Sequence, residues 1–293
     1  MLERLSNTFW GLGVQGLRLG KRVGMPAPVE RAIVWTGRHV IPMPSRPLEI
    51  RLPFAQSFRV PPDFSRARSY AVGTYEKDVT ELLQAAIKPG MTFVDIGAFC
   101  GYYTLLASRL VGETGHVYAF EPHPVNFGYL TLNVRANGCD NVTTVNAAVS
   151  DQVGQMDLVI DDEADHYWLR HRDGGSRAAI KVDTVTLDDF FAKEPSRRIE
   201  VMKIDIEGSE PAVFAGMQAT SCANPALQAV VEYDIANLER SGYTHETFVE
   251  AAARLGFRRG FVIERGLAPF SVRGSFPRPG GTYDPLLKKA DSA

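Results

Sequence analysis

Three charged side chains alternate with apolar ones in the segment VMKIDIEGSE, residues 201–210. In a β-strand, the period of two places Lys203, Asp205 and Glu207 on one face. A central parallel strand is covered on both faces and is normally almost entirely apolar, and burying an unpaired charge costs several kcal/mol. These side chains are therefore expected to pair with one another or to face a polar cleft. Charges retained at that cost indicate a functional site.

Two interpretations of this charged strand stay open. In the first, Asp205 lies at the carboxyl end of its strand and positions or deprotonates an acceptor. In the second, Lys203 and Asp205 form a structural ion pair, and Glu210 belongs to a cap that opposes the dipole of the next helix. The catalytic candidates under the first interpretation are Asp205, Glu207 and Lys203, with His166 as a reserve base.

A glycine loop follows another buried strand in the segment DIGAFCG, which begins at Asp95. Gly97 permits a tight turn and Gly101 opens the following helix. A dinucleotide-binding GxGxxG loop would carry a glycine where this chain has Phe99, so the spacing argues against a pyrophosphate cofactor. Ligands of parallel sheets bind beyond the carboxyl ends of the strands, so Asp95, Gly97, Ala98 and Gly101 are candidate cofactor-binding residues.

Further candidate binding residues come from the ends of neighbouring elements. Glu121 ends the strand HVYAFE, where a carboxylate can accept both ribose hydroxyls of a nucleoside, and Pro122 stiffens the exit from that strand. Ala148 and Asp151 lie at the end of the third strand, where an adenine ring is expected, and a plain transition from strand to loop is the alternative interpretation. Glu76 opens an earlier helix and could reach an amino group of the cofactor, although the helix dipole alone would explain an acidic first turn.

The elements that must position these residues alternate between strand and helix. The strands TFVDIG, HVYAFE and VTTVNAAV are separated by helical patterns, and two more buried strands, EVMKIDIE and QAVVEYD, follow. This alternation predicts an α/β fold with a doubly wound, mostly parallel sheet that has helices on both faces. The segment FRRGFVIERGLAPFSVR predicts a terminal pair of strands.

Three regions are expected along the chain. Residues 1–70 are rich in prolines and predict an N-terminal appendage made of a helix and a hairpin. Residues 71–275 form the main domain. Residues 276–293 are expected to form a C-terminal tail, whose glycine- and proline-rich segment FPRPGGTYDP is expected to be exposed or disordered.

Four ordered motifs resemble the FkbM-type methyltransferase family. They are DIGAFCGYYT at 95–104, AFEPHPVNFGYLTLN at 119–133, TLDD at 186–189 and KIDIEGSE at 203–210. The resemblance implies a class I, Rossmann-like enzyme that uses S-adenosylmethionine, with an antiparallel strand near its C-terminus. It also implies methylation of hydroxyl groups on sugars, polyketides or other natural products, which makes a small molecule or a glycan the expected partner. The family often carries Asn-Ile-Gly where this chain has Phe-Cys-Gly, a departure that leaves the turn intact.

Composition narrows the possible partners and the expected location. The 293 residues carry a formal net charge of -2, which gives no general attraction to nucleic acid. The three cysteines form no CxxC pair, so a reducing, cytoplasmic setting is expected. No uninterrupted apolar run reaches the length of a membrane span. The N-terminal appendage could support a homo-oligomer.

A divalent metal ion is possible but is not predicted. Oxygen ligands for such an ion could come from several acidic residues: Asp183, Asp188, Asp189, Asp205 and Glu207. These residues are spread along the sequence, and positions in solvated loops and helix caps would explain them equally well.

Three rival functions have different expected signatures. A nicotinamide-dependent oxidoreductase shares the acidic residue after the second strand but needs the closer glycine spacing. A nucleic-acid or other N-methyltransferase should show a basic stripe and an aromatic base pocket in place of KIDIEG. A non-catalytic binding partner would retain the fold and the nucleoside site but would not depend on Asp205.

Overall fold

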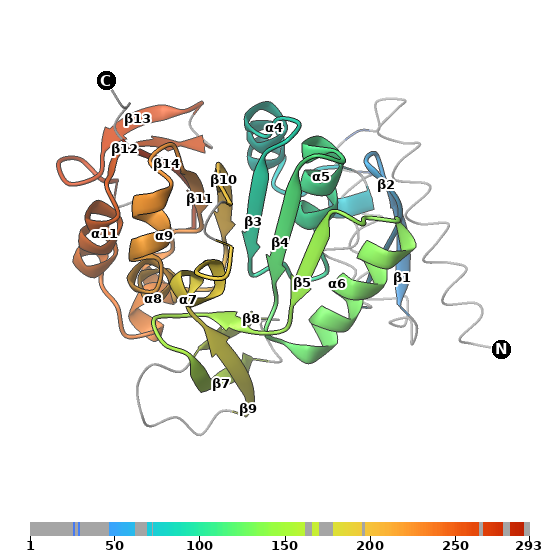
Figure 1. Ribbon diagram of the computed structural model, residues 1–293, viewed down its shortest axis with the longest axis horizontal. Coiled ribbons are helices and arrows are strands. Elements are labelled where there is room, and N and C mark those ends of the chain that lie inside the picture. The colour runs from blue at the N-terminus through green and yellow to red at the C-terminus, as the bar shows by residue number, and fades with distance from the viewer. Residues whose placement is uncertain are drawn as a thin grey trace.

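The computed structural model describes residues 26, 29, 47–61, 69–71, 73–161, 166–169, 178–194, 197–263, 266–277 and 282–289. Eight strands of this part form the main sheet: β3 Thr92–Ile96, β4 His116–Phe120, β5 Val142–Val145, β10 Val201–Ile204, β11 Gln228–Val231, β12 Phe257–Val262, β13 Ala268–Ser271 and β14 Pro285–Lys289. Their order across the sheet is β13-β12-β14-β11-β10-β3-β4-β5 (Figure 1).

The five strands from β5 to β11 in this order are parallel to one another. Four of them end in register, because Ile96 pairs with Phe120 on one side and with Ile204 on the other, and Ile204 pairs with Val231. The next residue of each strand therefore emerges at the same edge of the sheet. These four residues are Gly97, Glu121, Asp205 and Glu232.

Helices cover both faces of the sheet, as the alternation of elements predicts (Figure 1). One face carries α4 Lys77–Ala86, α5 Tyr102–Val111 and α6 Pro124–Ala136. The other face carries α7 Leu187–Phe191, α8 Glu210–Ala215, α10 Ile235–Arg240 and α11 His245–Arg254, and α9 Gln218–Ala223 follows α8. Adjacent residues of β3 point to opposite faces of the sheet. Phe93 packs in the core beneath α4, α5 and α6, and Val94 packs in the core on the other face.

The C-terminal strands complete a doubly wound, mostly parallel α/β fold, which confirms the class I Rossmann-like arrangement. β14 lies between β11 and β12 and is antiparallel to both of them, and β13 pairs with β12 on the outer side. The expected boundary at residue 275 is therefore wrong, because residues 285–289 belong to the interior of the sheet and are not an exposed tail. Leu286 packs in one core and Leu287 in the other, which explains why so short a segment is held there.

An N-terminal hairpin, β1 Leu48–Leu52 and β2 Ala55–Val60, forms as the sequence predicts. It is not a loose appendage, however, because Phe58 is fully buried in the same core as α5 and α6. Asn133 of α6 fixes it: the side-chain amide accepts from the Arg59 N–H at 2.7 Å and donates to the Arg59 carbonyl at 2.8 Å. The helix expected in the N-terminal appendage, on residues 2–19, lies outside the described residues, as does any oligomer contact through it.

A second sheet of four strands continues the chain after β5. It comprises β6 Ala148–Val149, β7 Gly154–Asp161, β8 His166–Leu169 and β9 Ala179–Val185, in the order β6-β9-β7-β8. The expected third strand, VTTVNAAV, is thus divided between two sheets. The break is at Asn146, whose side-chain amide donates to the carbonyls of Glu121 and Pro122 at 2.8 and 3.1 Å. Within the described part of the chain, no helix has the length and apolar character needed to span a membrane.

Candidate active site

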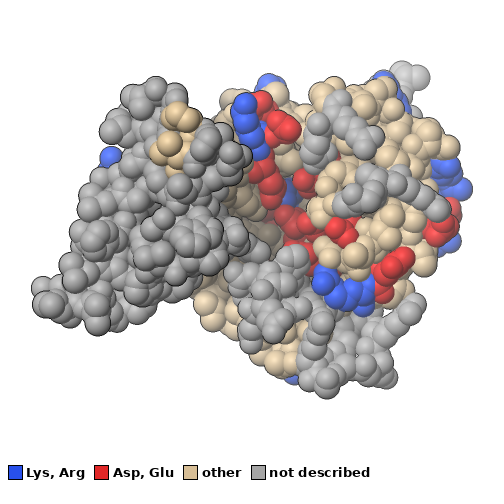
Figure 2. Space-filling view, turned by 180° about the vertical axis from the view of Figure 1, so that it is seen from behind, with Lys and Arg blue, Asp and Glu red and all other residues tan. Residues whose placement is uncertain are grey.

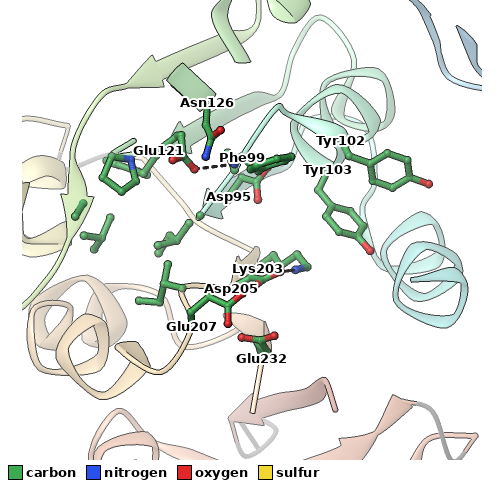
Figure 3. Close-up of a pocket in the computed structure, with 18 of the residues that line it drawn as sticks. Asp95, Phe99, Tyr102, Tyr103, Glu121, Asn126, Lys203, Asp205, Glu207 and Glu232 are labelled. Carbon is green, nitrogen blue, oxygen red and sulfur yellow. Dashed lines mark hydrogen bonds and ion pairs between the residues drawn. The ribbon is translucent and has the colours of Figure 1, made fainter. Parts of the chain in front are cut away.

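A cavity of about 340 Å³ lies at the carboxyl edge of the parallel strands. The ends of β3, β4, β10 and β11 contribute Gly97, Glu121, Asp205 and Glu232 to its lining, and residues of the second sheet, including Leu158, close another side. Figure 3 shows Lys203 of β10, and the carboxylates that follow β10 and β11, opposite the glycine loop. A volume of this size is at the lower end of the range for small-molecule sites.

Gly97 is required by the close approach of two strand ends. Its φ is +83°, and a Cβ atom built on it would lie 1.9 Å from the carbonyl oxygen of Asp205. The amides of Gly97 and Ala98 both donate to the carbonyl of Phe120 at 3.0 Å, which ties the loop to β4. Only glycine therefore lets the loop after β3 lie against the end of β10, and this contact sets the geometry of the cavity.

Glu121 is a buried carboxylate that holds the glycine loop. Its Oε2 accepts from the Phe99 N–H at 2.8 Å, and its Oε1 accepts from the His123 N–H at 2.9 Å. Burial raises the pKa of Glu121 to about 7, although these backbone donors and the Asn126 side chain act to lower it. Each carboxylate oxygen can accept more than one hydrogen bond, so both retain acceptor capacity toward the cavity.

Asp95 is buried beside the same loop, and the Thr104 hydroxyl donates to its Oδ2 at 2.6 Å. Burial raises the pKa of Asp95 to about 6, against the lowering effect of Thr104 and of the nearby Lys203 ammonium. The hydrogen bond joins the end of β3 to the first turn of α5. Asp95 therefore stabilises the turn as well as lining the cavity.

Lys203 is buried and joins two carboxylates. Its Nζ lies 2.5 Å from Asp205 Oδ2 and 3.6 Å from Glu76 Oε2, and 4.9 Å from the centre of the Tyr103 ring. Burial alone would lower the pKa of Lys203, but the carboxylates of Asp205 and Glu76 raise it well above its ordinary value. The ion pair expected under the structural interpretation is therefore present, and it lines the cavity.

Two more carboxylates lie next to Asp205. Glu207 follows β10 with a φ of +60°, and its Oε2 accepts from the Asn237 amide at 2.7 Å. Glu232 follows β11, and its Oε2 is buried without a hydrogen-bond partner among the described residues. Burial and repulsion by Asp205 and Glu207 raise the pKa of Glu232 well above its ordinary value. Figure 2 shows that acidic side chains gather in a hollow on this face of the molecule.

Aromatic side chains form a wall that the sequence reasoning missed. Tyr70, Tyr75, Tyr102 and Tyr103 pack edge to face or tilted against one another, with ring centres 4.3 to 6.2 Å apart, and all four line the cavity. The Tyr103 hydroxyl donates to Glu76 Oε2 at 2.8 Å. The doublet Tyr102-Tyr103 after the glycine loop was the available signal, whereas Tyr70 and Tyr75 come from a segment without regular periodicity.

Most of the candidate residues come together in the cavity: Glu76, Asp95, Gly97, Ala98, Glu121, Pro122, Ala148, Lys203, Asp205 and Glu207. Among the described residues, Gly101 and Asp151 do not line it. Gly101 precedes α5 and packs against Leu130, and Asp151 is exposed because the chain turns away after β6. The backbone of His166 lies in β8, but its side chain is outside what the structure describes.

Comparison with known families identifies the fold's relatives. The family model described as the Methyltransferase FkbM domain matches residues 95–261, which is more than half of the chain and includes the glycine loop and the charged strand. The chain belongs to this FkbM methyltransferase family. The resemblance carried by the four sequence motifs is thereby confirmed.

Two curated relatives and one solved structure show how far the similarity extends. The 31-O-demethyl-FK506 methyltransferase FkbM of Streptomyces tacrolimicus is 28% identical over 162 residues, 45% of this chain and 61% of that protein. A protein-L-isoaspartate O-methyltransferase of Methanothermobacter thermautotrophicus is 30% identical over 67 residues, 23% of this chain and 30% of that protein. The structure of the FkbM methyltransferase of Methylobacillus flagellatus KT is 13% identical with a TM-score of 0.42, and covers 77% of this chain and 55% of that one. The chain thus spans less than two thirds of the curated relatives it matches.

Proposed function

We propose that this FkbM-family protein transfers a methyl group from S-adenosylmethionine to a hydroxyl group of a sugar, glycan or natural product. The observation that carries the proposal is the arrangement of four in-register strand ends. They bring Glu121 and the glycine loop to one side of a cavity and Asp205 to the other. The name of the Streptomyces relative, which specifies an O-methyltransferase, supports a hydroxyl acceptor.

The residues on the β3 and β4 side fit a nucleoside. Glu121 accepts backbone N–H groups with both oxygens and keeps acceptor capacity for two ribose hydroxyls, and Asn126 lies beside it. Pro122, Ala147 and Ala148 supply small apolar surface for an adenine ring. The glycine loop offers no pyrophosphate cradle, because Phe99 stands where a dinucleotide site needs glycine.

The residues on the β10 side fit the reacting end of the donor and the acceptor. When bound, S-adenosylmethionine supplies a methyl group that its sulfonium already activates, so alignment is the main task of the protein. Asp205 can orient an acceptor hydroxyl and accept its proton. Lys203, buried behind Asp205, holds the carboxylate in position, and Glu76 lies where it can receive the amino group of the donor.

Binding experiments on the full chain test the donor assignment. We expect calorimetric titration to give one S-adenosylmethionine per chain and no comparable binding of NAD. Tight binding of NAD together with absence of S-adenosylmethionine binding would reject the proposal in favour of an oxidoreductase.

Transfer of a labelled methyl group to fractionated glycans and hydroxylated metabolites tests the acceptor assignment. Once an acceptor is found, Asp205→Asn should lower the turnover by about 100-fold or more, because it removes the proton acceptor. The exposed Asp140→Asn serves as the matched control and should retain full turnover. If Asp205→Asn transfers methyl groups at the rate of the unaltered protein, the role given to Asp205 is wrong.

A small-molecule or glycan acceptor, and not nucleic acid, is part of the same proposal, because acidic side chains gather at the cavity and would repel phosphate (Figure 2). We also propose a cytoplasmic location, supported by Cys100, Cys139 and Cys222, which form no disulfide in the part of the chain that the structure describes.

A further inference from the structure

Three carboxylates from two adjacent strands converge within the cavity. One oxygen from each of Asp205, Glu207 and Glu232 can be chosen so that all three lie within 4.8 Å of one another, and all three residues are partly buried. The separation is compatible with three oxygens that share one cation at the distances usual for hard divalent ions. Acidic groups often gather without binding an ion, so the short separation of the three carboxylates does not by itself identify a metal site.

The carboxylate of Glu232 also points to a bound cation, because one of its oxygens lacks a hydrogen-bond partner among the described residues. Within the part of the chain that the structure describes, its Oε2 is buried and makes no hydrogen bond, although the carboxylate lines the cavity. A buried acceptor without a partner costs free energy, and a buried charge costs more. In Figure 3, the Glu232 carboxylate lies next to Asp205 and Glu207 and faces the space between the two strand ends. A cation in that space would supply the missing partner.

The surrounding structure fixes the three side chains. Register between β10 and β11 pairs Ile204 with Val231, so Asp205 and Glu232 leave the sheet side by side. Lys203 holds one oxygen of Asp205, and the Asn237 amide holds Oε2 of Glu207. Hydrogen bonds of this kind, from residues behind the ligands, typically orient the ligands of a metal ion.

We infer that Asp205, Glu207 and Glu232 bind one divalent cation, Mg²⁺ or Mn²⁺, in the acceptor half of the cavity. Oxygen-only ligands favour these hard ions over zinc or copper. The inference deepens the proposed function and rests on it for its purpose. The bound cation would hold the acceptor's hydroxyl oxygen and lower the pKa of that hydroxyl, and the proton would pass to Asp205, the proton acceptor of the proposed function. The cation site itself can be tested without donor or acceptor.

Titration of the full chain with Mn²⁺ alone, followed by the electron paramagnetic resonance signal of the free ion, measures this site. We expect one Mn²⁺ per chain and competition by Mg²⁺. Glu232→Gln, which keeps the shape of the side chain but removes its charge, should weaken Mn²⁺ binding about tenfold or more. The exposed Glu113→Gln is the matched control and should bind Mn²⁺ as the unaltered protein does.

Thermal unfolding separates loss of the site from loss of the fold. Without metal, Glu232→Gln should unfold at a temperature no lower than that of the unaltered protein, because it removes a buried carboxylate with no partner. Mn²⁺ should raise the unfolding temperature of the unaltered protein and of Glu113→Gln, but not that of Glu232→Gln. A folded Glu232→Gln variant that binds Mn²⁺ with undiminished affinity overturns the inference, as does absence of saturable binding to the unaltered protein up to about 5 mM.

The same protein sample distinguishes this failure from failure of the proposed function. S-adenosylmethionine is titrated in the presence of a chelator, where no cation is bound. Donor binding without any Mn²⁺ binding leaves the methyltransferase proposal intact and rejects the metal site. Mn²⁺ binding without donor binding supports the metal site and rejects the methyltransferase proposal.

Discussion

Burial changes the acid-base behaviour of single carboxylates at the carboxyl edge of the sheet. Glu121 has a pKa of about 7 and Glu210, which is buried at the start of α8, a pKa of about 8, in both cases chiefly because burial disfavours the charged form. Both accept backbone N–H groups, and Glu210 takes those of Ile206 and Gly208 at its Oε1. Their charge therefore changes near neutral pH, unlike that of an exposed carboxylate.

This behaviour of Glu121 predicts a pH-dependent donor affinity. In the proposed donor site, the ionised carboxylate would accept both ribose hydroxyls, whereas the protonated form loses one acceptor position, so protonation below pH 7 should compete with binding. Calorimetry should therefore show weaker S-adenosylmethionine binding at pH 6 than at pH 8. Glu121→Gln should weaken binding by about tenfold at pH 8 and remove most of the pH dependence. An unchanged pH dependence in that variant would assign the titration to another group.

At the scale of elements, the contact between the β3 loop and the end of β10 decides whether the site exists. Gly97 and Gly138 both have a positive φ, +83° and +61°, but only Gly97 has backbone atoms in the space that a side chain would need. Replacing each glycine by alanine therefore separates two free-energy costs: that of the left-handed backbone conformation, which both positions carry, and that of the close approach of Asp205, which only Gly97 carries.

We expect Gly97→Ala to lower the free energy of unfolding by about 3 kcal/mol, because strain adds to displacement of Asp205. Gly138→Ala should cost only about 1 kcal/mol, the cost of the left-handed conformation. Urea denaturation measures both values. Equal losses in the two variants would show that Asp205 gives way to the new methyl group and that the strand contact is loose.

The hydrophobic pattern of the sequence predicts strands and helices well within apolar segments, but it predicts poorly where a strand ends and the chain turns. TFVDI and HVYAF are short, mostly apolar runs before a turn, so both strands and their end residues could be predicted. The charged strand was expected to include Glu207, but β10 ends at Ile204 because the chain turns at Asp205, where it meets the glycine loop. The gathering of Asp205 with Glu232 depends on strand register, which a single sequence does not encode.

At the scale of the whole molecule, the strand β14 decides how the sheet is completed. Its five residues follow a run rich in glycine and proline, so no periodicity marks them as an interior strand. Only the burial of Leu286 and Leu287 on opposite faces reveals their role, and burial depends on the tertiary fold. The parallel part of the fold and the presence of an antiparallel strand near the C-terminus were therefore predictable, whereas the assignment of that strand to residues 285–289 was not.

The position of β14 predicts that Leu287 contributes strongly to stability. Leu287→Ala should lower the free energy of unfolding by about 3 kcal/mol, because Leu287 is fully buried and its truncation leaves a cavity. The same substitution at the exposed Leu267 should change it by less than about 0.5 kcal/mol. Chemical denaturation compares the two variants. Similar small effects would mean that residues 285–289 dock weakly on the sheet.

The same strand sets the order in which the molecule can be assembled during synthesis. β11 and β12 emerge from the ribosome before β14, yet neither pairs with the other, because β14 lies between them. Until residues 285–289 are released, β11 has an open edge with apolar residues such as Val230, a surface prone to wrong pairing. The sheet therefore closes from its interior, and only once residues 285–289 have left the ribosome; a nascent chain paused before this strand would expose the open edge of β11.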